Sequence, residues 1–172
     1  MVNVVLVGFP ASGKSVLGRM LAHRMKLHFI DLDEAIEEHC NNTIPRIFEQ
    51  YGEYFFRERE REALLASLEK DGVLIATGGG TPCYGDAMAR INARAVSVYL
   101  KADENTLTKR LLHDKDNRPL VCGKSRAEIT RYVHETLQRR HPYYAQATLT
   151  VLADDSADSI VKQIQAKLDT VR

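Results

Sequence analysis

The sequence predicts an α/β fold in which a parallel sheet is covered by helices. Two observations predict it. Short apolar runs typical of strands alternate with longer segments of helical period, and the first of these runs leads through a glycine-containing turn into a helix. The chain has 172 residues, near the usual size of one domain. Because no linker, repeat or low-complexity tract divides it, we expect a single domain over residues 1–172.

The elements can be justified in order along the chain. The expected strands are short apolar runs at Val4–Val7, His28–Asp31, Val73–Ala76, Ala95–Leu100 and Ala147–Val151. The expected helices are segments of helical period at Lys14–Met25, Asp33–Cys40, Pro45–Tyr51, Glu53–Lys70, Gly85–Ile91, Asp103–Leu112, Arg126–His141 and Ala157–Val171.

Local signals support some of these helix ends. Ser125 and Glu128 make a capping box ahead of the helix at Arg126, because each side chain can satisfy a free backbone N–H. Gly72 suits a left-handed stop after Lys70. The last helix carries one apolar stripe, formed by Ile160, Ile164 and Leu168.

One segment breaks the alternation. Between Leu112 and Ser125 the sequence HDKDNRPLVCGK is polar, contains Pro119 and Gly123, and has no clear period. It is either an ordinary surface connector or a loop that closes over a site, and its length and its arginine support the second interpretation.

Composition excludes several classes of protein. The 24 Lys and Arg nearly balance the 23 Asp and Glu, leaving a net charge of +1 and no global attraction to nucleic acid or an anionic membrane. Cys40, Cys83 and Cys122 are odd in number and lack metal-site spacing, which favours reduced, idle thiols in an intracellular chain. No signal segment and no run of ~18 apolar residues occurs. We therefore expect a soluble cytoplasmic protein.

The stretch VGFPASGKSVLG follows an expected strand and opens an expected helix. Gly8, Gly13, Lys14 and Ser15 fit the pattern G-x-x-x-x-G-K-[ST]. In such a loop, backbone N–H groups surround a phosphate and the helix dipole favours the anion. Lys14 can reach the β- and γ-phosphates, and the Ser15 hydroxyl can bind Mg²⁺. The alternative is a purely structural turn, which the flanking strand and helix disfavour.

Two aspartates follow the second strand, in FIDLDEAIEE. Asp31 ends that strand and Asp33 comes two residues later. Because ligands bind at the carboxyl ends of parallel strands, both should face the crevice of the phosphate loop. One could hold Mg²⁺ through water, and the other could orient or deprotonate an attacking hydroxyl. An equally weighted alternative is that Asp33 only caps the helix that begins at Glu34.

Three further segments are informative together. YFFRERERE contains Arg57, and most of its alternating charges fit a solvated helix face with i,i+3 and i,i+4 ion pairs. ATGGGTP follows the third strand, where Gly78–Gly80 would let a ligand approach the backbone or would form a tight turn. QRRHPYY ends a helix with Arg139 and Arg140, which also suit the helix dipole without any ligand.

Together these residues resemble the shikimate kinase family over nearly the full length of the chain. The motifs that carry the resemblance are GFPASGKS, the D-x-D of FIDLDEAIEE, the FR-x-x-E that begins at Phe56, the GGG after the third strand, the RPL of Arg118–Leu120 and the R-x-P-x-Y of Arg140–Tyr144. Their order and spacing are more specific than any one of them. The resemblance implies the nucleoside monophosphate kinase type of fold. This is a three-layer αβα arrangement with a five-stranded parallel sheet in the order 2-3-1-4-5, acceptor-binding helices at about 33–61 and a lid loop at about 112–125.

The resemblance also implies an activity and its residues. The reaction would transfer the γ-phosphoryl group of ATP, with Mg²⁺, to the 3-hydroxyl of shikimate, a step in chorismate and aromatic amino-acid biosynthesis. The implied acceptor-binding residues are Asp33, Phe48, Phe56, Arg57, Gly78, Gly79, Gly80 and Arg140. The implied ATP-binding residues are Gly8, Ala11, Ser12, Gly13, Lys14, Ser15, Val16, Arg110 and Arg118. The implied catalytic residues are Asp33, Lys14 and Arg118, with Ser15 and, through water, Asp31 as metal ligands.

Within these sets, the resemblance gives Arg57 and Arg140 the shikimate carboxylate, and Asp33 the ring hydroxyls. Planar guanidinium groups suit a carboxylate because they can donate paired hydrogen bonds. Arg118 would reach the transferred phosphoryl group, and either Arg110 or Lys109 would face the base. We expect a monomer that binds ATP and shikimate, with no nucleic-acid or membrane partner.

Two other interpretations stay open on the sequence. A gluconate-type or other small-metabolite kinase can share the fold, since fold alone does not fix the acceptor. Arg57, Arg140 and Asp33 nevertheless favour a cyclic hydroxy acid. A module of another class would sense ATP or GTP and switch a partner, and it would need neither a base nor an acceptor pocket. Nucleotide turnover with and without shikimate would distinguish these interpretations.

Overall fold

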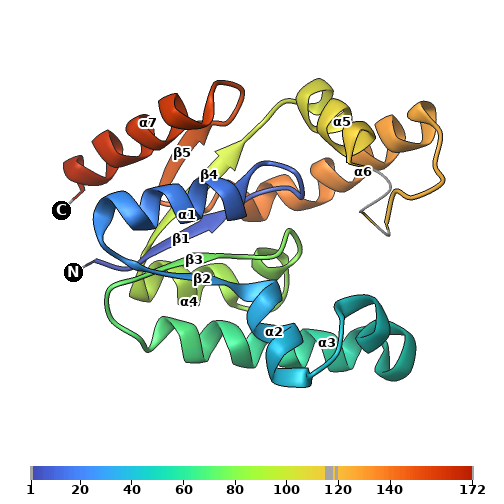
Figure 1. The fold of residues 1–172 in the computed structure, drawn as a ribbon, viewed down its shortest axis with the longest axis horizontal. Helices are drawn as coiled ribbons and strands as arrows, with labels where there is room; N and C mark the ends of the chain where they lie inside the picture. The colour runs from blue at the N-terminus through green and yellow to red at the C-terminus, as the bar shows by residue number, and fades with distance from the viewer. Residues whose placement is uncertain (1, 115–117, 119, 172) are drawn as a thin grey trace.

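The computed structural model describes residues 2–114, 118 and 120–171, and its centre is one parallel sheet (Figure 1). Within these residues the sheet has five strands in the order β2-β3-β1-β4-β5, and every neighbouring pair is parallel. The strands are β1 Val4–Val7, β2 His28–Asp31, β3 Val73–Ala76, β4 Val96–Lys101 and β5 Leu149–Leu152. The strand order and direction confirm the predicted fold class.

Helices cover both faces of the sheet, so the molecule has three layers (Figure 1). They are α1 Lys14–Met25, α2 Leu32–Cys40, α3 Ile44–Leu68, α4 Ala87–Arg94, α5 Glu104–His113, α6 Arg126–Tyr144 and α7 Ala157–Thr170, with a short 3₁₀ turn η1 at Thr81–Cys83. On one face α1 packs against α7, and on the other α3 packs against α4. At the carboxyl edge of the sheet, α2 packs against α3 and α5 packs against α6 (Figure 1).

The central strands explain why the sequence alternates as it does. All four residues of β1 and all four of β3 are buried, because both faces of these strands carry helices. Val5 pairs with Ile75 in the middle of this core. Burial of each such side chain contributes roughly 1.5–3 kcal/mol to folding, so these runs fix the sheet. Within the described part of the chain, every helix is too short or too polar to cross a lipid bilayer.

Several predicted helix signals are present in the structure. The Ser125 hydroxyl accepts from the Glu128 N–H at 3.2 Å, and the Glu128 carboxylate accepts from the Ser125 N–H at 2.7 Å, which completes the capping box. Gly72 has a φ of 66°, as expected of a left-handed stop. The apolar stripe of the last helix is buried at Ile160, Ile164 and Leu168.

Many boundaries shift by one to three residues from the prediction, and three differences have a structural reason. The two expected helices Pro45–Tyr51 and Glu53–Lys70 form one element, α3, with a kink where Gly52 has φ 80° and ψ 175°. Helix α6 continues through Pro142 to Tyr144, although it was expected to end at His141. Proline removes one ladder hydrogen bond, but the fully buried Tyr144 side chain holds the last turn in place. The last strand is shifted from the predicted Ala147–Val151 to Leu149–Leu152, the residues that pair with β4.

Candidate active site

The loop between β1 and α1 wraps around the N-terminus of α1. Gly13 is the N-cap and has a φ of 96°, a conformation that favours glycine. A Cβ on Gly8 would lie 2.8 Å from the carbonyl oxygen of Leu100, so only glycine lets the loop lie against β4. Lys14 donates from Nζ to the carbonyls of Gly8 and Phe9, at 2.8 and 2.9 Å. Its ammonium is thereby held across the loop.

The surroundings of Lys14 show which charges meet at this loop. Burial lowers the pKa of Lys14 to about 8. The nearby Arg140 and Arg118 act in the same direction, whereas Asp33 and Asp31 oppose the shift. Two predicted carboxylates and two predicted arginines, distant in sequence, therefore lie close enough to influence one ammonium group.

The other predicted nucleotide-binding residues lie around the same loop. Ser12 is buried, and in the described part of the chain its hydroxyl has no hydrogen-bond partner. Ala11 has a φ of 70°, unusual for a residue with a Cβ. Val16 is 62% exposed on α1. Arg110 donates to the carbonyl of Ala11 at 3.1 Å and to that of Ala153 at 2.7 Å, so it links the phosphate loop to the segment after β5.

Arg118 comes from the segment that the sequence analysis singled out as a lid. Its Nε donates to the carboxylate of Asp114 at 3.0 Å. Residues 115–117 and 119 of the predicted lid, including Pro119 of the RPL motif, lie outside the described residues.

The two aspartates after β2 have different surroundings. Asp31 accepts from the backbone N–H of Asp33 at 3.1 Å and of Glu34 at 3.4 Å, so Asp31 is the N-cap of α2. Ser15 donates to the other oxygen of Asp31 at 2.5 Å. The interpretation in which Asp33 merely caps the helix is therefore wrong, because Asp31 takes that role. The carboxylate of Asp33 faces the Gly78 turn instead.

Asp33 lies in an unfavourable place for a negative charge. Burial, together with the neighbouring Asp31 and Glu60, raises its pKa to about 6, while Lys14 acts against them. A carboxyl with this pKa is mostly ionised at neutral pH but is more basic than an ordinary aspartate. These are the properties that general-base chemistry requires.

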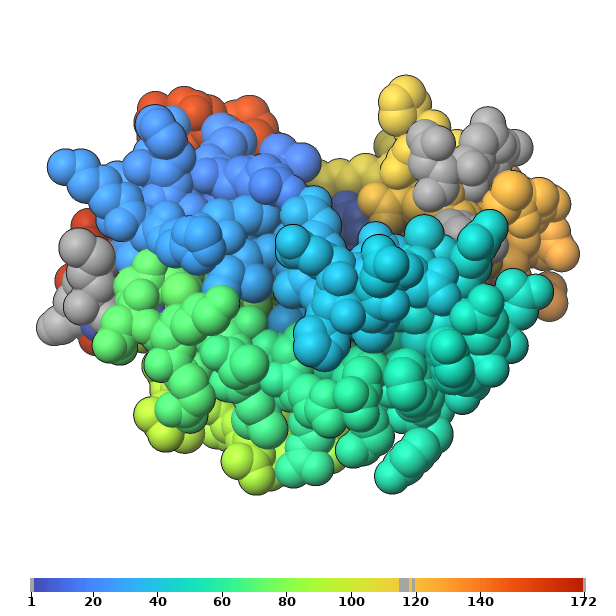
Figure 2. All heavy atoms as spheres, turned by 60° about the horizontal axis from the view of Figure 1, so that its bottom comes forward, coloured from blue at the N-terminus to red at the C-terminus, as the bar shows by residue number. Residues whose placement is uncertain are grey.

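The glycine turn after β3 brings the predicted acceptor residues together. A Cβ on the first residue of Gly78–Gly80 would lie 3.0 Å from Oδ1 of Asp33. A Cβ on Gly79 would lie 3.0 Å from Nη1 of Arg140. A Cβ on Gly80 would lie 2.9 Å from Nη1 of Arg57. Three side chains, from α2, α6 and α3, thus meet over one turn that has no side chains of its own. Figure 2 shows the molecule hollowed between the cyan α2–α3 region and the yellow and orange α5–α6 region, with blue N-terminal residues at the floor.

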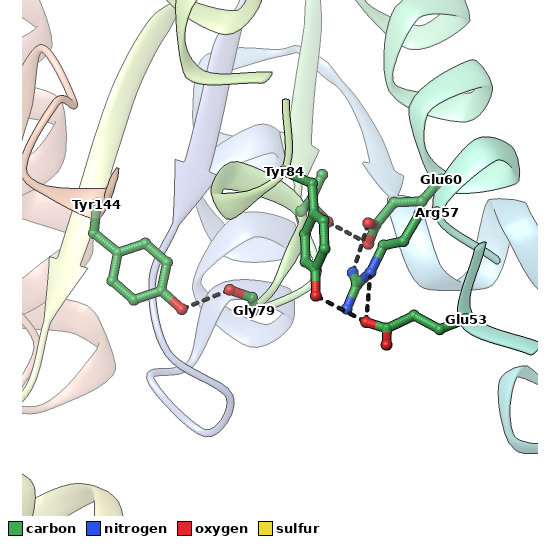
Figure 3. A network of polar contacts seen from close by, with 7 residues as sticks. Glu53, Arg57, Glu60, Gly79, Tyr84 and Tyr144 are labelled. Carbon is green, nitrogen blue, oxygen red and sulfur yellow. Dashed lines mark hydrogen bonds and ion pairs between the residues drawn. The ribbon is translucent and has the colours of Figure 1, made fainter. Parts of the chain in front are cut away.

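Arg57 is held by the carboxylate of Glu60, the glutamate of the FR-x-x-E motif. Its Nη1 donates to Oε1 of Glu60 at 2.8 Å, and Thr81 donates to Oε2 of Glu60 at 2.7 Å (Figure 3). Glu60 is only 3% exposed, so it is not one of the solvated charges that were expected for most of this segment. The signal was the helical period, since Glu60 lies four residues after buried Phe56 and four before buried Leu64.

The opposite wall is built by the end of α6. The fully buried Tyr144 donates to the carbonyl of Gly79 at 2.5 Å, which fixes the glycine turn against α6 (Figure 3). Burial raises the pKa of Tyr144, whereas Arg140 beside it acts in the opposite direction. Across the crevice the rings of Phe48 and Phe56 lie 4.6 Å apart between centroids.

One family of known proteins matches a stretch of the chain that includes the aspartate pair, the glycine turn and Arg140. The family model described as "Shikimate kinase" matches residues 10–169. The chain belongs to the shikimate kinase family. Among relatives in that family, the shikimate kinase of Phocaeicola vulgatus is 40% identical over 172 residues, covering 100% of this chain and 97% of the relative.

Solved structures of the family agree with the fold. The crystal structure of shikimate kinase from Bacteroides thetaiotaomicron matches with a TM-score of 0.93 at 35% identity and covers 98% of both chains. Shikimate kinase from Acinetobacter baumannii, solved in complex with shikimate, matches with a TM-score of 0.89 at 30% identity, covering 100% of this chain and 95% of that one.

Proposed function

We propose that this protein transfers the γ-phosphoryl group of ATP to the 3-hydroxyl of shikimate, giving shikimate 3-phosphate and ADP for chorismate and aromatic amino-acid biosynthesis. The observation that carries the proposal is the Gly78–Gly80 turn. Each of its residues lies against a different member of the set Asp33, Arg140 and Arg57, beside the ammonium of Lys14. A carboxylate clamp, a base and a phosphate loop in one crevice match an acceptor that is both anionic and hydroxylated.

On the donor side, we propose that the phosphate loop and the arginines around it bind ATP. The proposed set is Gly8, Ala11, Ser12, Gly13, Lys14, Ser15, Val16, Arg110 and Arg118. The N–H groups at the start of α1 and the unpartnered Ser12 hydroxyl are suited to phosphate oxygens. Lys14 and Arg118 would offset the charge on the phosphoryl group during transfer.

On the acceptor side, Arg57 and Arg140 would bind the carboxylate of shikimate from two walls of the crevice. The backbone of Gly78–Gly80 would approach the ring, and the paired rings of Phe48 and Phe56 would form an apolar wall. Such positioning matters because phosphoryl transfer asks little covalent chemistry of the protein.

Asp33 would act as the general base. Its carboxylate would accept a hydrogen bond from the attacking hydroxyl and take the proton as the new O–P bond forms. Its raised pKa leaves it mostly ionised at neutral pH and makes it a better proton acceptor than a fully solvated aspartate.

Magnesium fits the donor set at the start of α1. The Ser15 hydroxyl and the Asp31 carboxylate are oxygen ligands of the kind that Mg²⁺ prefers, and they lie 2.5 Å apart beside the loop. Among the described residues, no three His, Cys, Asp or Glu side chains form a metal site of their own, so Mg²⁺ would be held jointly with the phosphates. When bound, the ion neutralises phosphate charge. Ser15 would bind it directly and Asp31 through water.

We further propose one kinase domain over residues 1–172, with acceptor-binding helices at about 33–61 and a lid at about 112–125. A monomeric, cytoplasmic enzyme remains a prediction from the sequence.

The proposal is tested by ADP release over a panel of shikimate, quinate, gluconate and nucleoside monophosphates. ADP release should depend on shikimate, and the product should be shikimate 3-phosphate. A gluconate-type kinase would respond to a different member of the panel, and a nucleotide sensor to none. Lys14→Ala should abolish transfer and serves as the control for contaminating kinases.

A further inference from the structure

The guanidinium of Arg57 contacts an aromatic ring in addition to Glu60. Its Cζ lies 3.8 Å from the centroid of the Tyr84 ring, a short distance for cation–π stacking. The Tyr84 hydroxyl donates to Oε1 of Glu53 at 2.8 Å, and that same oxygen lies 3.5 Å from Nε of Arg57. Figure 3 shows Arg57 enclosed by Tyr84, Glu53 and Glu60.

These contacts restrain the orientation of the guanidinium. Stacking on Tyr84 sets the plane of the group, Glu60 accepts a hydrogen bond from Nη1 at 2.8 Å, and Glu53 forms a longer ion pair with Nε at 3.5 Å. The carboxylates favour the charged form of Arg57 against the effect of burial, and its pKa is raised. The orientation of the planar fork is therefore set by the protein and is ready for a carboxylate.

Without the Tyr84 ring, Arg57 would have space to turn away from the crevice. A groove of about 650 Å³ lies behind it, between α3 and the segment that leads into α4. Arg57, Tyr84 and Glu53 all line this groove, and Tyr84 is 45% exposed. Open space therefore borders Arg57, and the stacked Tyr84 ring restrains the guanidinium beside it.

We infer that Tyr84, tied to Glu53, is a positioning residue that sets the preference of this site for a carboxylate-bearing acceptor, acting through Arg57. The inference deepens the proposed function and rests on it. Tyr84 comes directly after η1 and none of the motifs of the sequence analysis included it, so nothing in the chain's sequence alone pointed to this role.

The test compares shikimate with its neutral carboxamide as acceptors for the full-length enzyme. Tyr84→Leu keeps apolar bulk but removes the ring, and should raise the KM for shikimate roughly 5- to 30-fold, with the KM for ATP unchanged. The preference for shikimate over the carboxamide should also fall, because only the carboxylate can form paired, charge-assisted hydrogen bonds with Arg57. Tyr84→Phe keeps the ring and should restore most of this preference.

Tyr54→Ala is the matched control. Tyr54 lies on α3, lines the same groove and is 80% exposed, so its removal opens the groove without touching the Arg57 contacts. It should leave both acceptors at the wild-type values. Glu53→Gln, which keeps an acceptor for the Tyr84 hydroxyl but removes the charge, should shift the preference in the same direction as Tyr84→Leu by a smaller factor.

An unchanged preference in Tyr84→Leu, or an equal loss for shikimate and carboxamide, would overturn the inference. So would a loss in Tyr84→Phe as large as in Tyr84→Leu. Should Tyr84→Leu not fold, Tyr84→Met takes its place, since it also removes the ring that stacks on Arg57, and an unchanged preference in Tyr84→Met would contradict the inference in the same way. A wild-type enzyme that does not phosphorylate shikimate would instead refute the proposed function, so the two failures are distinct.

Discussion

The two arginines that we propose to hold the acceptor carboxylate are prepared in different ways. Arg57 is surrounded by protein partners, with Glu60, Glu53 and the Tyr84 ring around one guanidinium. Arg140, on the opposite wall, pairs with no carboxylate among the described residues, and its positive charge lowers the pKa of Lys14. Arg57 therefore contributes a guanidinium of fixed orientation, whereas Arg140 contributes positive charge that no carboxylate among the described residues pairs with.

This division of roles has an electrostatic reason. An unpaired Arg57 would repel the positive charges of Lys14 and Arg140. Because Arg57 is paired with Glu60, it can donate hydrogen bonds to the acceptor with little added electrostatic repulsion. A carboxylate bound between the two walls would then restore charge balance mainly on the Arg140 side.

The largest effect is expected where neither arginine is changed. Asp33→Asn removes the proposed base and should lower kcat by ~10²–10⁴-fold, with ATP binding near normal. In the wild type, kcat/KM should fall as the pH drops through about 6, because protonated Asp33 cannot accept the proton. The variant should lack this acidic limb. Normal turnover in Asp33→Asn would remove Asp33 from the mechanism and leave the arginines as binding groups only.

Truncating each arginine in turn tests whether the two side chains have different roles. Both Arg57→Ala and Arg140→Ala should raise the KM for shikimate roughly 10- to 100-fold, since each removes charge-assisted hydrogen bonds, and should leave the KM for ATP much less affected. Only Arg57→Ala should also lower the free energy of unfolding, by about 3 kcal/mol, because it leaves buried Glu60 without its counter-charge.

A second substitution separates the two effects. Adding Glu60→Gln to Arg57→Ala should recover stability in urea unfolding without recovering the KM for shikimate. Equal stability of the two single variants would show that the walls do not differ in the way proposed, and equal changes in the two KM values would contradict a carboxylate clamp.

Replacing each arginine by lysine is a smaller change that tests the same difference between Arg57 and Arg140. Lysine keeps the charge of arginine but has no planar fork and cannot be held at two edges. Arg140→Lys should therefore retain more activity on shikimate than Arg57→Lys, with a KM raised roughly 3- to 10-fold in the former. Steady-state kinetics at one salt concentration measure both KM values. The opposite ranking would mean that Arg140 contributes the fixed orientation and Arg57 mainly the charge.

The smallest expected effect concerns how the ionisation of Asp33 changes the stability of the fold. The pKa of Asp33 is raised above its unfolded value, so its ionised form destabilises the fold, and the penalty grows as the pH rises through about 6. Asp33→Asn should therefore raise the free energy of unfolding by about 2 kcal/mol at pH 8. Near pH 4 the gain should largely vanish in the same urea titration. A variant no more stable than the wild type at pH 8 would contradict the unfavourable burial of this charge.

Much of the fold could be predicted from the sequence because local hydrophobic patterning determines where the central strands lie. The apolar runs of β1 and β3 are buried on both faces, and the phosphate-loop pattern marks where β1 ends and α1 begins. The ends governed by distant packing were less predictable. Pro142 normally favours termination of a helix, and only the buried Tyr144 side chain, which reaches Gly79, accounts for the extra turn of α6.

The site was predictable where a residue's role follows from its neighbours in sequence. Gly8, Gly13 and Lys14 belong to one loop, and the structure brings them together as expected. The partners of Arg57 were not predictable in the same way. Glu60 belongs to the FR-x-x-E motif, but the motif did not indicate that Glu60 is buried against Arg57, and Tyr84 reaches Arg57 only because η1 turns the chain back toward α3.

The two carbonyls that Arg110 binds, those of Ala11 and Ala153, belong to opposite ends of the chain. A shortened or rearranged C-terminal segment would withdraw one of them, and the remaining hydrogen bond would have to hold the guanidinium alone. Changes made far from the catalytic groups, in the stretch that leads into the final helix, should thus be transmitted to the nucleotide side through this single cross-tie.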